Sequence, residues 1–406
     1  MKARNVLATL GSFLLILGLG AIPFSMSLTT SPAFAAEDKT LEIGVLAALT
    51  GFGSAAETLI AQGAEVAQDW VNEKGGITVD NQKYMVKLVV EDTKSTATGT
   101  VAAATKLVFD DKVKFILGTV VPYMVEAGGT VTEPAEVLRV LAYNCAMPSE
   151  YGPKTPYTFL GQDASVEGAI ASLTYLVESH PEVKSVVFII PDDGSIPYLG
   201  KVVKQLAEER GLTVKGEVIG WTHDTVDFTP IAAKATARDP DAIHMTNGWP
   251  GPLGSILKAA REAGYTKPIV SFHNPAPDVK MVAGEAASTN FITNGIIYDD
   301  PGNPPMIKEL GDRFVKKYGN AFYYHYWGFN LLYHLAQAIE AADSIDPKVV
   351  KTKWETMDTI DTVYGPGRMC GEKTYGFKHT VCHPVAIQVL DEGKVTQVKW
   401  VDVVTP

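Results

Sequence analysis

The chain has 406 residues, of which 46% are hydrophobic and 20% are charged, and its formal net charge is −11 at pH 7. This length exceeds the roughly 100–200 residues of one domain, so two domains are expected. An acidic chain without a basic cluster is poorly suited to bind nucleic acid or an anionic membrane surface. A mean hydropathy near zero is typical of a globular protein and excludes a disordered one.

Residues 1–35 have the pattern of a secretory signal peptide. A basic start and an apolar run over 6–24 lead to Ala33 and Ala35, which form the A-x-A pattern that signal peptidase cuts. An uncleaved membrane anchor is the alternative, because the apolar run is nearly long enough to span a bilayer. The charged stretch that follows favours cleavage. We therefore expect an exported, soluble chain that begins near Ala36 and carries no membrane span.

Short apolar runs alternate with longer amphipathic ones along the remaining chain, and this alternation is typical of strands and helices in an α/β protein. The first series has strands at 41–49, 84–91, 114–117 and 139–143, with helices at 55–74 and 97–110. The second has strands at 185–190, 213–219, 242–245 and 268–272, with helices at 198–210, 229–237 and 254–263. Helices at 327–342 and 348–357 and a hairpin strand over 393–404 follow. The sequence predicts two doubly wound parallel sheets, with a boundary near 155–165.

The three cysteines are Cys145, Cys370 and Cys382. In an oxidising compartment, Cys370 and Cys382 are the natural disulfide pair, and the segment between them resembles a hairpin. A metal site built from these two cysteines with His379 and His383 is the rival interpretation. Adjacent Cys-His ligands would strain tetrahedral geometry, so the disulfide is favoured and no metal is expected.

A glycine-rich turn at 51–56 follows the first strand and opens a helix with the pattern G-x-G-x-x-A, which can seat a dinucleotide pyrophosphate. That fingerprint requires an acidic residue about 20 residues later, whereas Glu91 and Asp92 come about twice as far along. No dinucleotide or other cofactor is therefore expected. The turn still suits an anion such as a carboxylate, because a helix N-terminus faces it.

Signatures of hydrolytic enzymes are missing from the sequence, which contains neither G-x-S-x-G nor H-E-x-x-H. Asp192 and Asp193 end a strand and are candidates for acid/base chemistry, but Pro191 and Gly194 beside them indicate a turn. The aromatic run over 322–329 is expected in the core, with one or two rings at a pocket. A binding protein is therefore favoured over an enzyme.

Seven stretches spread along the chain carry a more specific signal. They are residues 43–51, 71–77 (Val-Asn-Glu-Lys-Gly-Gly-Ile), 90–93, 115–118, 227–230 (Asp-Phe-Thr-Pro), 258–264 and 335–342. Together they resemble the branched-chain amino acid type of periplasmic substrate-binding proteins over nearly the whole exported chain. The resemblance implies a type I periplasmic-binding fold whose two lobes close on one small ligand. It also implies a monomeric, non-enzymatic receptor in the periplasm that delivers its ligand to the membrane permease of an ABC importer.

In that family three segments cross between the lobes. Transferred to this chain, the crossings fall near 160–163, 291–295 and 364–367, where Gly-Pro-Gly suits a hinge. The resemblance then implies a first lobe of 37–161 plus 293–365 and a second lobe of 162–292 plus 366–406.

The resemblance also implies a set of ligand-binding residues in loops at the carboxyl ends of strands. The first lobe contributes Phe52, Pro122, Tyr123, Asn144, Cys145 and Ala146, and the second contributes Tyr198, Asn247, Trp249, His273 and Asn274.

Two of these positions depart from the amino-acid binders of the family. Those proteins have a hydroxyl where this chain has Pro122 and a carboxylate where it has Asn274, with His273 beside it. An ammonium group in a closed cleft needs a charged partner. The sequence therefore favours an organic acid, aromatic acids included, over an amino acid. Asp163 or Glu167 near the first crossing is the alternative partner for an ammonium group.

Overall fold

The computed structural model describes residues 39–143, 147–222 and 224–403. The predicted signal peptide at 1–35 lies outside these ranges, and so do Asn144, Cys145 and Ala146 of the predicted site. Within the ranges, no helix is both long and apolar enough to cross a membrane.

The first sheet has nine strands in the described residues. They are β1 (Lys39–Ala47), β2 (Ile77–Val79), β3 (Gln82–Asp92), β4 (Phe115–Leu117), β5 (Leu138–Leu141), β6 (Thr158–Leu160), β13 (Ile360–Thr362), β14 (Gly365–Cys370) and β15 (Thr380–Cys382). Their order across the sheet is β13-β14-β15-β6-β5-β4-β1-β3-β2. The centre, from β3 to β15, is parallel, and the outer pairs are antiparallel.

The second sheet has eight strands in the same part of the chain. They are β7 (Ser185–Pro191), β8 (Thr213–Val214), β9 (Ile219–Trp221), β10 (Ala242–Met245), β11 (Ile269–Ser271), β12 (Phe291–Asn294), β16 (Val385–Asp391) and β17 (Lys394–Val401). The order is β17-β16-β12-β11-β10-β7-β8, and β9 also pairs with β7. All pairs from β8 to β12 are parallel, and the β16–β17 hairpin adds an antiparallel edge.

Helices connect the parallel strands, because such strands can be joined only by a crossover. The α-helices are α1 (Ser54–Glu73), α2 (Ala97–Thr105), α3 (Pro122–Thr132), α4 (Ser165–Ser179), α5 (Ile196–Glu209), α6 (Thr229–Thr236), α7 (Pro250–Glu262), α8 (Ala276–Ala283), α9 (Pro305–Tyr318), α10 (Tyr323–Ala342), α11 (Pro347–Glu355) and α12 (Glu372–Tyr375). A π-helical turn, η1 (Lys106–Asp110), extends α2, and a 3-10 turn, η2 (Glu285–Ala287), follows α8.

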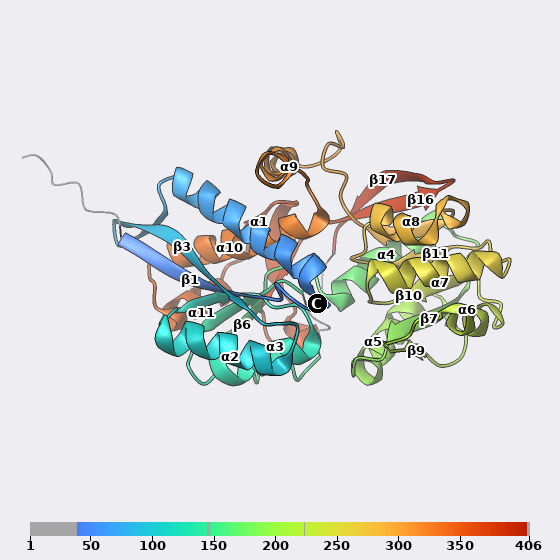
Figure 1. The fold of residues 1–406 in the computed structure, drawn as a ribbon, viewed down its shortest axis with the longest axis horizontal. Helices are drawn as coiled ribbons and strands as arrows, with labels where there is room; N and C mark the ends of the chain where they lie inside the picture. Colours follow the sequence, from blue (N-terminus) through green and yellow to red (C-terminus); the bar gives the residue numbers. More distant parts are fainter. Residues whose placement is uncertain (1–38, 144–146, 223, 404–406) are drawn as a thin grey trace, which may run out of the picture. The chain divides into compact units, whose positions relative to one another are not determined.

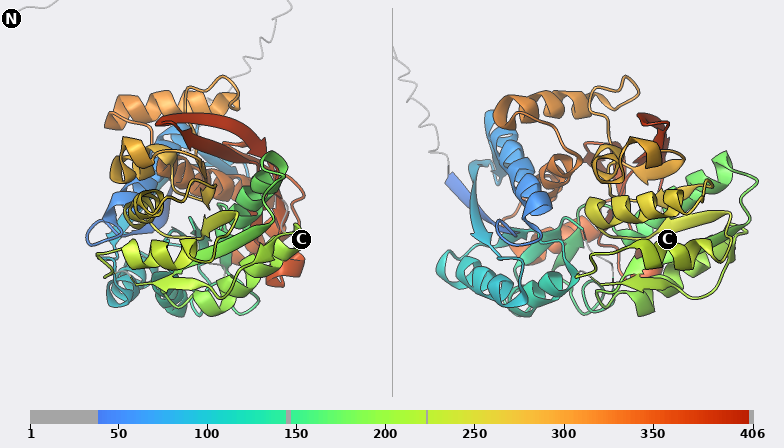
Figure 2. Two further views of the ribbon diagram at one scale, coloured as in Figure 1. Left: turned by 90° about the vertical axis from the view of Figure 1, so that its right-hand side faces the viewer. Right: turned by 45° about the vertical axis from the view of Figure 1, so that its right-hand side comes forward.

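Each sheet is covered by helices on both faces, as Figures 1 and 2 show. The strand β7 illustrates why. Val187 and Ile189 pack into the layer of α6, α7 and α8, whereas Val186, Phe188 and Ile190 pack into the layer of α4 and α5. Successive side chains of a strand point to opposite faces, so a strand covered on both sides is apolar throughout. The predicted fold class, two doubly wound α/β units, is confirmed.

Most predicted elements are found with shifts of a few residues, but the strand predicted at 213–219 is wrong. The structure has two short strands there, β8 and β9. Gly216, with φ of 76°, turns the backbone between them, and positive φ is a conformation that an extended strand does not contain.

The chain passes between the sheets at three places in the described residues. It leaves the first sheet after β6, leaves the second after β12, and passes over finally at residues 383–384, between β15 and β16. The last position differs from the predicted crossing near 364–367. The Gly-Pro-Gly segment instead begins β14, and β14 and β15 both belong to the first sheet. Sequence spacing does not show this excursion, because β14 and β15 are short strands joined by a hairpin.

The predicted disulfide between Cys370 and Cys382 is confirmed. It joins β14 to β15, and α12 lies in the connection between these strands. The bond occupies both sulfurs that the rival metal site would have required. Among the described residues, no group of three or more histidine, cysteine or acidic side chains is placed to hold a metal ion.

Candidate functional site

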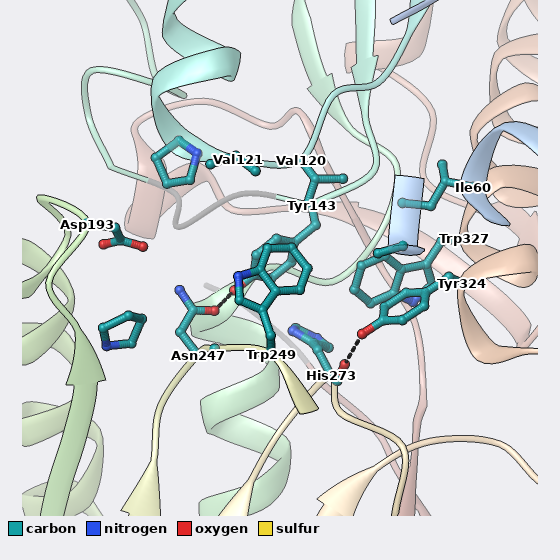
Figure 3. A pocket seen from close by; sticks show the side chains of 14 residues that line it. Ile60, Val120, Val121, Tyr143, Asp193, Asn247, Trp249, His273, Tyr324 and Trp327 are labelled. Atoms are coloured by element: carbon teal, nitrogen blue, oxygen red, sulfur yellow. Dashed lines mark hydrogen bonds between the residues drawn. The ribbon is translucent and has the colours of Figure 1, made fainter. Parts of the chain in front are cut away.

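A pocket lies where the carboxyl ends of strands from both sheets converge (Figure 3). Between its walls is about 600 Å³ of space, part of it open to solvent. Strand-end loops supply most of the lining, and α1 and α10 supply the rest. The lining residues are Ala56, Ile60, Val120, Val121, Pro122, Tyr143, Pro191, Asp193, Asn247, Gly248, Trp249, His273, Tyr324 and Trp327. This is the place where open α/β sheets bind their ligands.

The loops after β10 and β11 reach the pocket through an unusual backbone conformation. Asn247, Gly248 and His273 have φ of 68°, 119° and 57°. This left-handed region is readily adopted by glycine, and asparagine and histidine adopt it more often than most other residues. It allows both loops to turn sharply after their strands.

Three aromatic rings pack tightly at the inner end of the pocket. Tyr143 stacks on Trp327 with ring centroids 5.7 Å apart, and His273 meets Tyr143 and Trp327 edge to face at 5.0 and 5.3 Å. The Tyr143 hydroxyl donates to Oδ1 of Asn247 and lies 2.6 Å from Oγ of Ser165. These contacts hold the rings in place. They also fix the orientation of the Asn247 amide, because its oxygen accepts the hydrogen bond from Tyr143.

His273 is tied to a buried carboxylate behind the pocket wall. Its Nε2 pairs with Oδ2 of Asp163, while the other oxygen accepts a hydrogen bond from Gln162 at 2.5 Å and lies 3.5 Å from Nε2 of His383. Burial acts to raise the pKa of Asp163, but the charge and hydrogen bond of His273, with His383 and Gln162, outweigh it and bring this pKa to about 2. Asp163 is therefore ionised and accepts a hydrogen bond from the Nε2–H group of the imidazole.

The second ring nitrogen of His273, Nδ1, is a buried polar atom without a hydrogen-bond partner among the described residues. The His273 side chain is only 6% exposed. A buried polar atom left unpaired is unfavourable. The backbone carbonyl of His273 accepts from the Tyr324 hydroxyl at 3.1 Å. These contacts hold the His273 side chain in place, while its Nδ1 atom has no hydrogen-bond partner in the described residues.

Asp193 is the acidic residue of the pocket lining. It is partly buried, and its Oδ1 accepts a hydrogen bond from the backbone N–H of Ser195 at 3.0 Å. Figure 3 shows it separated from His273, with Asn247 and Trp249 between them. No lysine or arginine is among the described residues that line the pocket.

The structure brings together only part of the predicted site. Pro122, Asn247, Trp249 and His273 line the pocket, and Phe52 lines an adjoining chamber.

The other described members of the predicted site lie outside both cavities. The Tyr123 hydroxyl donates to the Ser95 carbonyl at 3.0 Å. Tyr198 lies in the first turns of α5. Asn274 is buried, and its amide donates to the Phe272 carbonyl at 2.7 Å.

The two carboxylates named as alternative partners for an ammonium group do not line the pocket either. Asp163 is engaged with His273 as described. Glu167 accepts from the Tyr375 hydroxyl at 2.8 Å and from the Ala164 N–H at 3.1 Å. Both carboxylates are buried, with 2% and 1% of their surface exposed.

Sequence reasoning missed several lining residues for identifiable reasons. Asp193 was considered and assigned to a turn, because its proline and glycine neighbours gave the stronger signal. Tyr324 and Trp327 belong to the aromatic run, in which sequence alone does not separate core rings from pocket rings. Tyr143 ends a predicted strand, and its position at the carboxyl end was the signal that could have found it.

Known proteins share this sequence pattern and architecture. The family model described as periplasmic binding protein matches residues 40–394. A Leu/Ile/Val-binding protein homolog from Brucella suis biovar 1 is 25% identical over 341 residues, which cover 80% of this chain and 84% of that protein.

Two solved structures show the same fold. A leucine-binding protein from Thermotoga maritima has a TM-score of 0.74 at 21% identity, over 89% of this chain and 99% of that one. A solute-binding protein of an ABC transporter from Rhodopseudomonas palustris BisB5, in complex with 3,4-dihydroxybenzoic acid, has a TM-score of 0.71 at 16% identity, over 90% of this chain and 98% of that one.

Proposed function

We propose a ligand class for this protein from the premise that the chain belongs to the periplasmic binding protein family. It is a solute-binding receptor of the kind that serves ABC transporters, and not an enzyme. Its ligand, in our proposal, is a small organic acid with an apolar or aromatic body. It binds with the carboxylate at His273 and the body against the aromatic walls.

The observation that carries this proposal is the Asp163–His273 pair. Because Nε2 of His273 is engaged with Asp163, Nδ1 is the ring nitrogen left for a ligand in this proposal. When Nδ1 is also protonated, the imidazolium donates a charge-assisted hydrogen bond to a carboxylate, and such bonds are about twice as strong as neutral ones. Burial strengthens the interaction further, since little water screens it.

Two further features favour a negative group at this end. The helices α3 and α7 begin at Pro122 and Pro250, next to lining residues, and their N-termini carry partial positive charge. In this proposal the imidazole of His273 and these helix N-termini offset the repulsion from Asp163.

The walls suit an apolar body. Trp249, Trp327, Tyr143 and Tyr324 contribute aromatic surface, and Ile60 with its neighbours contributes aliphatic surface. Aromatic side chains pack well against a flat ring, edge to face or offset stacked.

An amino acid is the second candidate, and Asp193 favours it. This carboxylate lines the pocket with no cationic side chain of the lining beside it, and a ligand ammonium group would neutralise it. Known members of the fold include a leucine-binding protein and a protein solved with 3,4-dihydroxybenzoic acid, so both chemistries occur on this scaffold.

The remaining parts of the proposal concern context. The protein acts in the periplasm after removal of the signal peptide, as a monomer, and delivers its ligand to a membrane permease. The two lobes correspond to the two sheets and close about the three crossings, the third of which we place at residues 383–384. Sheet membership supports this division.

Calorimetric titration with benzoate, phenylacetate and leucine at pH 8 tests the ligand class. Benzoate or phenylacetate should bind, and leucine should not. In a thermal melt, an acid at one hundred times its dissociation constant should stabilise the protein by about 2.7 kcal/mol.

Two substitutions separate the candidates. His273→Gln should abolish acid binding, whereas His180→Gln, at a surface histidine paired with Glu182, should not alter it. Asp193→Asn should matter only for an ammonium-bearing ligand. If leucine binds, no acid does, and Asp193→Asn removes leucine binding, the organic-acid proposal is wrong and the amino-acid candidate replaces it.

A further inference from the structure

A second and larger chamber adjoins the pocket. Between its walls lies about 1440 Å³ of space, partly open to solvent, compared with about 600 Å³ in the inner pocket. Ala56, Trp249 and Tyr324 line both cavities, so they form the passage from one to the other. We call this space the outer chamber. The residues that line only it are Phe52, Ala55, Leu59, Trp221, Pro250, Gly251, Pro252, Asp278, Met281, Val282 and Phe322.

The outer chamber presents large apolar side chains to solvent. Met281 is 80% exposed, Phe52 is 53% exposed, and Phe322 and Val282 are each 41% exposed. Single exposed apolar residues are ordinary, but a contiguous group of them marks a binding surface. These four residues come from both sides of the cleft, since Phe52 and Phe322 precede α1 and α10, and the other two lie in α8.

The two sides already touch at the passage. The rings of Phe52 and Trp249 meet edge to face with centroids 6.4 Å apart. Phe52 follows β1 of the first sheet, and Trp249 follows β10 of the second. A chain-like group leaving the inner pocket would therefore run between aromatic surfaces before it reaches Met281.

Charge sets the direction in which a ligand would lie. Asp278 is the only charged side chain among the described residues of the outer chamber, and it is acidic. Each cavity has one acidic side chain in its described lining, Asp193 in the inner pocket and Asp278 in the outer chamber, but only the inner pocket also has a basic group, His273. The outer chamber offers a carboxylate no basic partner, so the apolar end of an acid would point outward.

We infer that the outer chamber binds the apolar tail of the same ligand whose carboxylate occupies the inner pocket. The substrate class is then an extended carboxylic acid, with an arylalkyl or straight alkyl chain, rather than a compact acid. This inference rests on the proposed function. It goes beyond it by stating the length of the ligand and the residues that contact its far end.

Calorimetric titration with a series of ω-phenyl acids tests the inference, running from phenylacetate through 4-phenylbutyrate to 6-phenylhexanoate. Each added methylene buried in the chamber should lower the dissociation constant about three- to fourfold. Met281→Ser should weaken binding of 6-phenylhexanoate about fivefold more than binding of phenylacetate. Val226→Ser is the matched control, because Val226 is 97% exposed and lines neither cavity.

The outcomes separate this inference from the proposed function. Rising affinity along the series, reduced by Met281→Ser but not by the control, supports it. If phenylacetate binds and affinity stays flat with chain length, the inference is overturned, and the chamber is only surface that the two sides cover on closing. If no acid of any length binds, the proposed function itself fails, and the inference falls with it.

Discussion

The carboxyl group of Glu57 gives the sharpest prediction for stability. It is buried in α1 with 1% of its surface exposed. One oxygen accepts hydrogen bonds from the Ala48 N–H at 2.9 Å and the Thr119 hydroxyl at 2.8 Å, and the other has no partner in the described residues. It thus joins the end of β1 to the loop that carries Val120 into the pocket. Substitution by glutamine keeps the shape and both acceptor contacts, and it removes the ionisation.

The magnitude follows from the pKa. Burial raises the pKa of Glu57 from 4.5 to about 7, against the opposing effect of the two hydrogen bonds, and the charge of Asp92 adds a smaller upward contribution. Between these two values the folded state binds more protons than the unfolded state, so stability falls as pH rises through this range and levels off above it. At 1.36 kcal/mol per pH unit, the whole effect is about 3 kcal/mol.

Urea denaturation of the wild type and of Glu57→Gln at pH 4.5 and pH 8 measures this effect. The free energy of unfolding of the wild type relative to the variant should be about 3 kcal/mol lower at pH 8 than at pH 4.5. Glu208→Gln, at an exposed glutamate of α5, should show no such change and serves as the control. A difference between wild type and Glu57→Gln that stays constant within about 0.5 kcal/mol over this range would refute the reasoning.

Three further predictions concern the site and the hairpin. Asp163→Asn removes the anion paired with the site imidazole and should weaken benzoate binding about tenfold or more in calorimetry; unchanged affinity would exclude that role. Replacing Cys370 and Cys382 by serine removes a disulfide between residues 12 positions apart in the chain. The free energy of unfolding, measured by urea denaturation, should fall by about 3 kcal/mol; a value equal to that of the wild type would contradict this prediction. A Cβ at Gly168 would lie 2.9 Å from the site imidazole, so Gly168→Ala should reduce stability by about 1–3 kcal/mol and weaken binding. A Cβ at Gly152, which lines neither cavity, would meet nothing closer than 3.7 Å, so Gly152→Ala should not weaken binding.

The sequence predicts the inner parallel strands β1, β3, β4, β5, β7, β10 and β11 and the helices α1, α2, α5, α6, α7, α10 and α11, but it gives no element at α3, α4, α8 and α9. Parallel strands buried on both faces are short apolar runs, and the helices between them show a 3.6-residue apolar period, so both kinds of segment stand out. The positions of Asn247, Trp249 and His273 are predicted through the family resemblance, which places ligand contacts in loops at the carboxyl ends of strands. All three line the pocket.

Contacts between segments far apart in the chain could not be predicted from the sequence. His273 and Asp163 are 110 positions apart, and no local pattern indicates that they pair. Asp163 was considered for the opposite task of binding an ammonium group, because a sequence does not show which way a carboxylate points. The membership of β14 and β15 in the first sheet could not be predicted either, because it depends on a contact between segments far apart in the chain. That contact is the parallel pairing of Thr380 in β15 with Leu160 in β6.

The buried carboxylate of Asp163 contacts both a pocket residue and a segment where the chain crosses between the sheets. Asp163 lies just after β6, where the chain leaves the first sheet, and its two oxygens are directed at His273 of the pocket and His383 of the last crossing. A buried anion must keep its partners, because leaving it unpaired costs several kcal/mol. In the proposed binding mode, a ligand carboxylate meets the same imidazole that neutralises Asp163. Substitution of Asp163 should therefore alter affinity and the proposed lobe closure together.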